Sequence, residues 1–128
     1  ALTEDTRHLV NSDSFELMKR SSILINISRG PIVDEVALVK ALKDEKIFGA
    51  GLDVFEQEPT SADNPLFQMK NVVLTPHNIA WTDELAKGMG RSAFNSIQSI
   101  SRGEIPKFIV NKEVLETPQF RSKLAKWR

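Results

Sequence analysis

Three stretches of the sequence carry side chains that could do chemistry. Arg29 stands beside the Gly30–Pro31 pair, where a guanidinium on a stiff loop is placed to grip an anion. Residues 53–58 include three carboxylates, and Pro59 follows them. His77 follows a proline, and histidine exchanges protons near neutral pH. Together the three stretches supply a fixed cation, an acid and a candidate base.

Each of these residues also has a plain structural explanation. Arg29 could cap a carbonyl or pair with a surface acid, and Asp53 could close a local turn or cap a loop amide. Glu56 and Glu58 could simply be solvent-exposed loop residues, which are common after a strand. His8 lies among polar residues and is interpreted as a solvated side chain, and Trp81 as a packing residue. The case for a site therefore depends on whether the fold brings the three stretches together.

The hydrophobic pattern predicts an α/β fold. Short apolar runs bounded by turn formers predict strands at Ile23–Ile27, Ala50–Phe55 and Asn71–Thr75. Between the first two runs, Asp34 is a good N-cap for a helix from about Glu35 to Lys46, which carries an apolar stripe at helical spacing. Strand, helix and strand in this order make a βαβ unit with parallel strands.

Parallel strands end at one edge of the sheet, and this is where open α/β sheets hold their ligands. Arg29, the segment Asp53–Glu58 and His77 each follow one of the three predicted strands. We therefore expect a guanidinium, a carboxylate and an imidazole to lie around one small cavity.

The remaining segments are predicted from capping residues and apolar spacing. Residues 1–11 are expected to contain a short helical turn, and Ser12 to be the N-cap of a helix through Arg20. Thr82 is expected to cap a long helix that stops at Gly103. An extended tail follows, and a basic helix opens at Thr117–Pro118.

Composition excludes several classes of function. The 128 residues, as a prior, make one domain, and with 17 basic and 17 acidic residues the net charge is zero, so nucleic acid and anionic membranes are not expected partners. Cysteine is absent, which excludes disulfides and thiolate metal sites and agrees with a reducing compartment. We expect no metal. No apolar run approaches the roughly 18 residues of a membrane span.

Three motifs, in order, resemble those of the D-isomer-specific 2-hydroxyacid dehydrogenases. They read ILINISRGPIVDE, GAGLDVFEQEP and NVVLTPHNIAWT, and the resemblance extends from Leu2 to about Arg102. It implies that residues 1–102 are the second half of a Rossmann-type NAD(P)-binding domain, with about three parallel strands. Residues 103–128 would be a C-terminal helix and tail returning toward a substrate domain. The sequence has no GxGxxG motif, so we expect a portion of a longer protein, with an unpaired sheet edge or an exposed apolar patch.

The resemblance implies a role for each of the three groups. Arg29 matches the arginine that binds the carboxylate and carbonyl of the substrate, a task suited to a planar guanidinium. His77 matches the acid–base that exchanges a proton with the C2 oxygen, and Glu58 matches the glutamate paired with that histidine. Glu56, two residues earlier, does not match this position.

The resemblance also implies a nicotinamide cofactor, NAD or NADP. Asp53 matches the aspartate that contacts the nicotinamide carboxamide. The segments that match the lining of the nicotinamide end are Ile27–Ser28 and Asn78–Ile79–Ala80. The second segment departs from many members of the family, because Asn78 stands where they have Ile-Ala or Leu-Gly directly after the histidine.

The implied activity is hydride transfer between NAD(P)H and C2 of a small 2-keto or 2-hydroxy acid, with D-stereospecificity. The implied setting is a cytoplasmic homodimer. Two alternatives stay open: a non-catalytic dinucleotide-sensing protein on the same scaffold, and an inactive isolated fragment. The sequence identifies neither the particular acid nor the choice of NAD over NADP, because the ribose-contacting acid is not within these residues.

Overall fold

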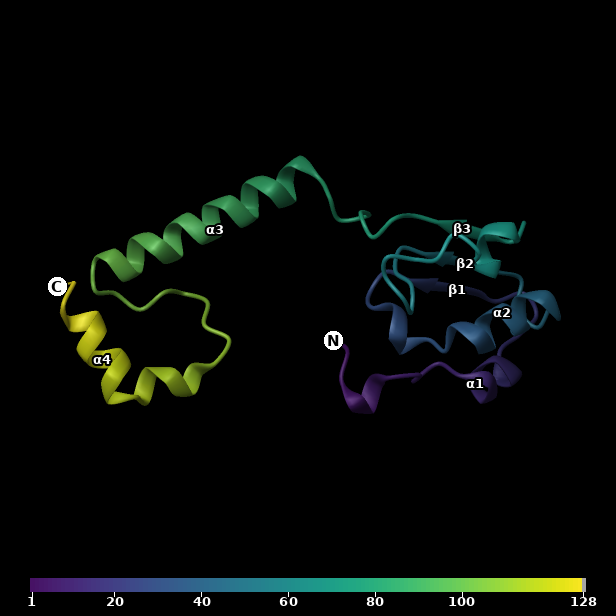
Figure 1. Ribbon diagram of the computed structural model, residues 1–128, viewed down its shortest axis with the longest axis horizontal. Helices are drawn as coiled ribbons and strands as arrows, with labels where there is room; N and C mark the ends of the chain where they lie inside the picture. The colour runs from purple at the N-terminus through teal and green to yellow at the C-terminus, as the bar shows by residue number, and fades with distance from the viewer. Residues whose placement is uncertain (128) are drawn as a thin grey trace. The chain divides into compact units, whose positions relative to one another are not determined.

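The computed structural model describes residues 1–127, which form two compact units (Figure 1). The first unit is Ala1–Ala80, and the second begins at Trp81. All of the predicted site residues fall in the first unit. The assignment of residues 1–102 to one domain and 103–128 to a returning tail stays a prediction.

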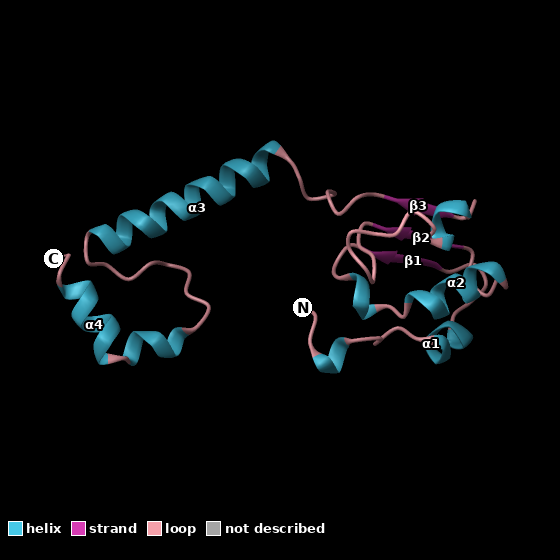
Figure 2. Cartoon of the chain, in the orientation of Figure 1, coloured by secondary structure: helices cyan, strands magenta, loops and turns pink. Residues whose placement is uncertain are grey.

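The first unit contains a parallel sheet of three strands, in the order β1-β2-β3. The strands are β1 (Ile23–Asn26), β2 (Gly49–Leu52) and β3 (Val72–Leu74), and they appear as magenta arrows in Figure 2. This confirms the predicted fold class. Each strand is shorter than predicted, because Ile27, residues 53–55 and Thr75 already belong to the loops at the carboxyl edge and Asn71 precedes β3. Strand β2 begins at Gly49, one residue before the predicted Ala50.

Helix α2 (Glu35–Lys43) connects β1 to β2 and covers one face of the sheet. Asp34 is its N-cap, as predicted, and accepts a hydrogen bond from the Ala37 amide at 3.0 Å. The helix ends three residues before the predicted Lys46, since Glu45 adopts a left-handed φ of 53° that a helix cannot continue. Its buried residues join the core formed with the sheet; they are Leu38, Ala41 and Leu42.

Helix α1 (Ser12–Leu17) differs from the prediction at both ends. Its N-cap is Asn11 and not Ser12, because the Asn11 side chain accepts from the amides of Asp13 at 3.1 Å and Ser14 at 3.2 Å. The helix stops at Leu17 and not at Arg20, since Met18 is extended. The short turn predicted near the start is present at Glu4–Thr6.

The other face of the sheet is exposed and apolar. Ile25 of β1 and Val73 of β3 flank Gly51 in the pairing register, and their exposed fractions are 69% and 71%. Ile23 lies on the same face of β1 and is 59% exposed. Along its other edge, β1 pairs with no strand in residues 1–127. The expected unpaired edge and apolar patch are therefore both present.

The second unit contains helix α3 (Asp83–Ser101) and helix α4 (Pro118–Ala125). Thr82 is the N-cap of α3, as predicted, and Gly103 follows the end of α3 with a φ of 67°. Helix α4 begins at Pro118, where the sequence predicted a helix to open, and Thr117 is its N-cap. No helix in residues 1–127 combines the length and the apolar character that crossing a membrane requires.

Candidate functional site

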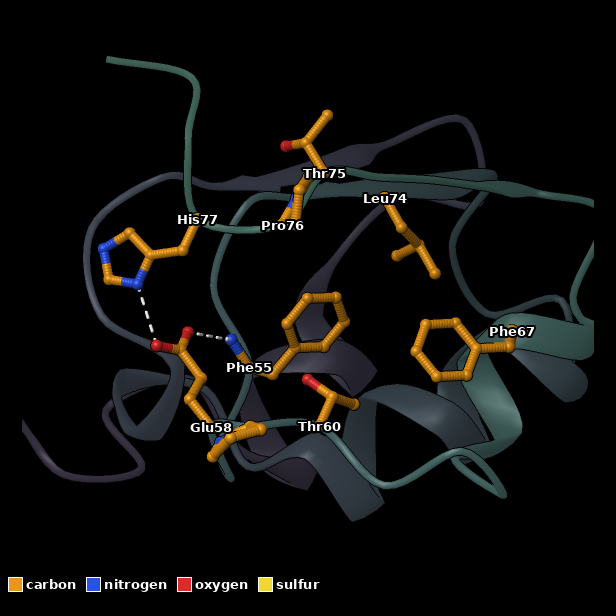
Figure 3. A pocket seen from close by; sticks show the side chains of 9 residues that line it. Phe55, Glu58, Thr60, Phe67, Leu74, Thr75, Pro76 and His77 are labelled. Carbon is orange, nitrogen blue, oxygen red and sulfur yellow. Dashed lines mark hydrogen bonds and ion pairs between the residues drawn. The ribbon is translucent and has the colours of Figure 1, made fainter. Parts of the chain in front are cut away.

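His77 and Glu58 form a hydrogen-bonded pair at the carboxyl edge of the sheet (Figure 3). Nδ1 of His77 lies 2.8 Å from Oε2 of Glu58, while Oε1 of Glu58 accepts from the Phe55 amide at 2.9 Å. His77 has a left-handed φ of 53° just after β3. Because a carboxylate only accepts, Nδ1 carries the proton, and Nε2 is the atom through which the ring can exchange one.

The pKa of Glu58 shows that its surroundings favour the charged form. Desolvation raises this pKa. The hydrogen bonds from Phe55 and His77, together with the charges of His77 and Arg29, lower the pKa and outweigh the desolvation. The net result is a pKa below the ordinary value. Glu58 is therefore an ionised partner for His77 at neutral pH, and Arg29 lies close enough to contribute.

The turn that carries Arg29 is held from the buried side by Asn26. The amide of Ser28 donates to Oδ1 of Asn26 at 3.1 Å, and Nδ2 of Asn26 donates to the Arg29 carbonyl at 3.1 Å. Asn26 is only 7% exposed. Sequence reasoning did not assign this role to Asn26, although a polar residue at the end of an otherwise apolar strand was the available signal.

The Arg29 side chain itself is exposed, and its Nη1 donates to the Ser28 carbonyl at 2.6 Å. This is the carbonyl-capping contact that the sequence left open as an alternative. Arg29 makes no hydrogen bond to Glu58 or His77, so it is linked to the hydrogen-bonded pair by charge and not by direct contact. Its part in holding a ligand stays a prediction.

Asp53 is 3% exposed and holds the loop that carries His77. Its carboxylate accepts from Thr75 Oγ1 at 2.5 Å and from the amides of Asn78 at 3.0 Å and Ile79 at 3.2 Å. Desolvation raises the pKa of Asp53, but these hydrogen bonds and the charge of His77 outweigh it and lower the pKa. The observed contacts are those of a cap on loop amides.

The other residues predicted at the nicotinamide end lie on the exposed side of the two loops. The side chains of Ile27 and Ile79 are 57% and 56% exposed, and Ser28 and Ala80 are also exposed. A contact of these residues with a cofactor stays a prediction.

A cleft of about 650 Å³ lies beside the histidine–glutamate pair (Figure 3). His77 and Glu58 contribute its titratable groups, while the rings of Phe55 and Phe67 pack at a centroid distance of 6.2 Å in its wall. Neither Arg29 nor Asp53 lines this cleft. The structure thus joins the acid and the imidazole in one cleft.

His8 is not simply solvated, and this interpretation of the sequence was wrong. Nε2 of His8 lies 2.6 Å from Oε1 of Glu56, so the chain contains a second histidine–glutamate pair. The residues lie 48 positions apart in the chain, which is why no local pattern revealed their contact.

The chain is similar to known dehydrogenases in sequence and in structure. The family described as D-isomer specific 2-hydroxyacid dehydrogenase, NAD binding domain, matches residues 1–78. A glyoxylate reductase of Korarchaeum cryptofilum is 47% identical over 115 residues, 90% of this chain and 35% of the relative. Glyoxylate/hydroxypyruvate reductase B of Enterobacter agglomerans is 47% identical over 114 residues, 89% of this chain and 35% of its own length.

Solved structures agree with the sequence relatives. D-lactate dehydrogenase with NAD+ from Lactobacillus jensenii superimposes with a TM-score of 0.79 at 30% identity, covering 86% of this chain and 37% of that one. The NADPH-dependent glyoxylate/hydroxypyruvate reductase of Sinorhizobium meliloti, in complex with NADP and malonate, gives 0.70 at 37% identity, covering 76% and 30%.

The chain spans about a third of the length of the curated relatives that it matches. Within that third, its parallel sheet, its three motifs and the match over residues 1–78 agree. The chain belongs to the family of D-isomer specific 2-hydroxyacid dehydrogenases.

Proposed function

We propose that the complete protein reduces a small 2-keto acid to the D-2-hydroxy acid with NADH or NADPH, and catalyses the reverse oxidation. The observation that carries this proposal is the pair in which Glu58 binds Nδ1 of His77, at 2.8 Å, beside the charge of Arg29. The relatives named glyoxylate reductase and glyoxylate/hydroxypyruvate reductase support a short substrate.

The proton transfer follows from the orientation of His77. With Nδ1 bonded to Glu58, Nε2 of the imidazolium donates a proton to the C2 oxygen during reduction and takes it back during oxidation. The Glu58 carboxylate stabilises the protonated ring and keeps its orientation through both directions. Arg29 binds the carboxylate of the acid and offsets the negative charge that develops on the C2 oxygen.

The residues present fit the nicotinamide end of a dinucleotide. Oδ2 of Asp53 accepts one hydrogen bond, from the Ile79 amide at 3.2 Å, and keeps a lone pair for a carboxamide donor. No GxGxxG loop for the pyrophosphate occurs in the sequence. The bound cofactor supplies the hydride, and this chain contributes the groups around the reacting carbon.

Steady-state kinetics of the complete protein test this function, with glyoxylate and hydroxypyruvate as substrates and NADH and NADPH compared. His77→Asn should lower kcat by about 10² to 10⁴-fold, the usual contribution of a positioned acid–base. Arg29→Lys should mainly raise KM for the acid, because an ammonium cannot hold a carboxylate with two parallel hydrogen bonds. Gln57→Ala is the control, since Gln57 is exposed beside Glu58, and it should keep wild-type kinetics.

Two results would overturn the proposal. One is a His77→Asn variant with wild-type kcat. The other is a wild-type protein that binds dinucleotide but turns over no 2-keto acid, which would favour the sensing function. The cytoplasmic localisation and the homodimer implied by the family resemblance stay predictions.

A further inference from the structure

We infer that His8, Glu35 and Glu56 are positioning residues: they form a clamp that holds the loop of Glu58 against the turn of Arg29. This inference rests on the proposed function, because the groups being positioned are the proposed acid–base partner and the substrate-binding cation. None of the three clamp residues lines the cleft beside His77. The clamp therefore acts through the residues that it holds.

The core of the clamp is a reciprocal bond between two glutamates. Oε2 of Glu56 accepts from the Glu35 amide at 3.0 Å, and Oε2 of Glu35 accepts from the Glu56 amide at 2.9 Å. Each carboxylate thus satisfies the backbone donor of the other residue. The contact joins the first turn of α2 to the loop after β2, although the residues lie 21 positions apart.

The remaining oxygens extend the clamp in two directions. Oε1 of Glu56 pairs with Nε2 of His8 at 2.6 Å, and the His8 amide donates to the Pro31 carbonyl at 2.8 Å. Oε1 of Glu35 accepts from Nδ2 of Asn64 at 2.7 Å. The two carboxylates therefore join four segments: the N-terminal segment, the start of α2, the Glu58 loop and the loop at Asn64. The His8 amide in turn links the N-terminal segment to the turn after Arg29.

The clamp holds the Phe55–Glu56 segment, whose position fixes Glu58 relative to the turn of Arg29. Gly30, the neighbour of Arg29, lies directly against the peptide between Phe55 and Glu56. The Glu56 amide is held by Glu35, and the adjacent Phe55 amide is held by Glu58. A shift of this short segment therefore moves Glu58 relative to both His77 and the Arg29 turn.

The two histidines use opposite ring nitrogens, and this gives the test a direct signature. Because the carboxylates accept, neutral His8 carries its proton on Nε2 and neutral His77 carries its proton on Nδ1. ¹⁵N spectra of histidine-labelled protein distinguish the two tautomers. The signal of His77 is assigned by its loss in the His77→Asn variant.

The test uses the complete protein and the Glu56→Ala variant, measured at a pH where the rings are neutral. We expect His77 to lose its fixed Nδ1–H tautomer, and kcat to fall about tenfold to a hundredfold, as a small misplacement of reacting groups produces. Glu56→Gln, which keeps one acceptor oxygen, should recover part of both readouts. Glu16→Ala is the matched control, since it removes an ion pair with Lys46 away from this loop.

A second variant covers the case in which Glu56→Ala does not fold. His8→Asn removes the imidazole, and asparagine tolerates the left-handed φ of 51° at this position, so the backbone is kept. It should shift the His77 tautomer and kcat in the same direction as Glu56→Ala, by a smaller factor.

The outcomes distinguish a failure of the clamp inference from a failure of the proposed function. Wild-type kcat and an unchanged His77 spectrum in Glu56→Ala and His8→Asn would overturn the clamp, when His77→Asn lowers kcat as the proposed function expects. A His77→Asn variant with full turnover would instead overturn the proposed function. The tautomer readout would still decide whether the clamp orients His77, because it needs no substrate.

Discussion

The backbone of Gly30 lies so close to Phe55 that a methyl group added at Gly30 would stand 1.7 Å from the Phe55 carbonyl oxygen. The obstacle is backbone, which cannot rotate away as a flexible side chain would. This contact sets the distance between the turn of Arg29 and the loop that leads to Glu58.

Gly30→Ala should therefore destabilise the first unit and disturb the site at the same time. Overpacking of this kind costs about 1–3 kcal/mol, and here both contacting partners are main chain, so the upper part of the range is expected. Urea denaturation measures the free energy of unfolding. Gly51→Ala is the control in the same sheet, because a Cβ there would meet Ile25 at an ordinary 3.8 Å, and an unaltered stability in both variants would contradict the prediction.

Asp53→Asn should lower stability at neutral pH and change its dependence on acid. The pKa of Asp53 in the fold is lower than its ordinary value of 3.8, so its ionisation stabilises the fold above that pH, and this contribution is lost as the pH falls through the lower value. The difference in unfolding free energy between wild type and variant should shrink below pH 3.8. Denaturant titrations at a series of pH values measure it, and a difference independent of pH would show that charge is not involved.

Asn11→Ala should lower the free energy of unfolding by about 1 kcal/mol, the usual effect of removing an N-cap. The neighbouring Ser12→Ala is the matched comparison and should have little effect, because Asn11 and not Ser12 binds the first amides of α1. Thermal unfolding of both variants checks this. The reverse order of effects would mean that Ser12 is the true cap.

The 128-residue chain should bind NADH only weakly, with a Kd of about 1 mM or higher. The negative pyrophosphate needs the amides of a glycine-rich helix start, and the sequence has no such motif. Fluorescence titration of NADH into the chain, with the complete protein as the positive control, measures this. Micromolar affinity would show that residues 1–128 suffice for the dinucleotide.

Local sequence was enough to predict the capping residues that bind nearby amides. Asp34 and Thr82 cap the helices that the pattern assigned to them. The exception was α1, where two adjacent residues, Asn11 and Ser12, are both good caps and short-range preference cannot choose between them. The carboxyl ends of the first two strands were predicted too late, since apolar residues continue past the observed ends, at Ile27 and at Val54–Phe55.

The sequence alone determined the α/β class, the parallel direction of the strands and the placement of residues 53–58 and His77 at one edge of the sheet. These follow from hydrophobic period and from the rule that parallel strands end at one edge, while the choice of Glu58 as the partner of His77 came from the family resemblance of the motifs. Only the tertiary structure decided three contacts between distant segments. The Asp53 carboxylate accepts hydrogen bonds from the loop of His77, the backbone of Gly30 lies against Phe55, and His8 pairs with Glu56. Such contacts join segments far apart in the chain, and their geometry depends on the packing of the whole unit, which no local pattern records.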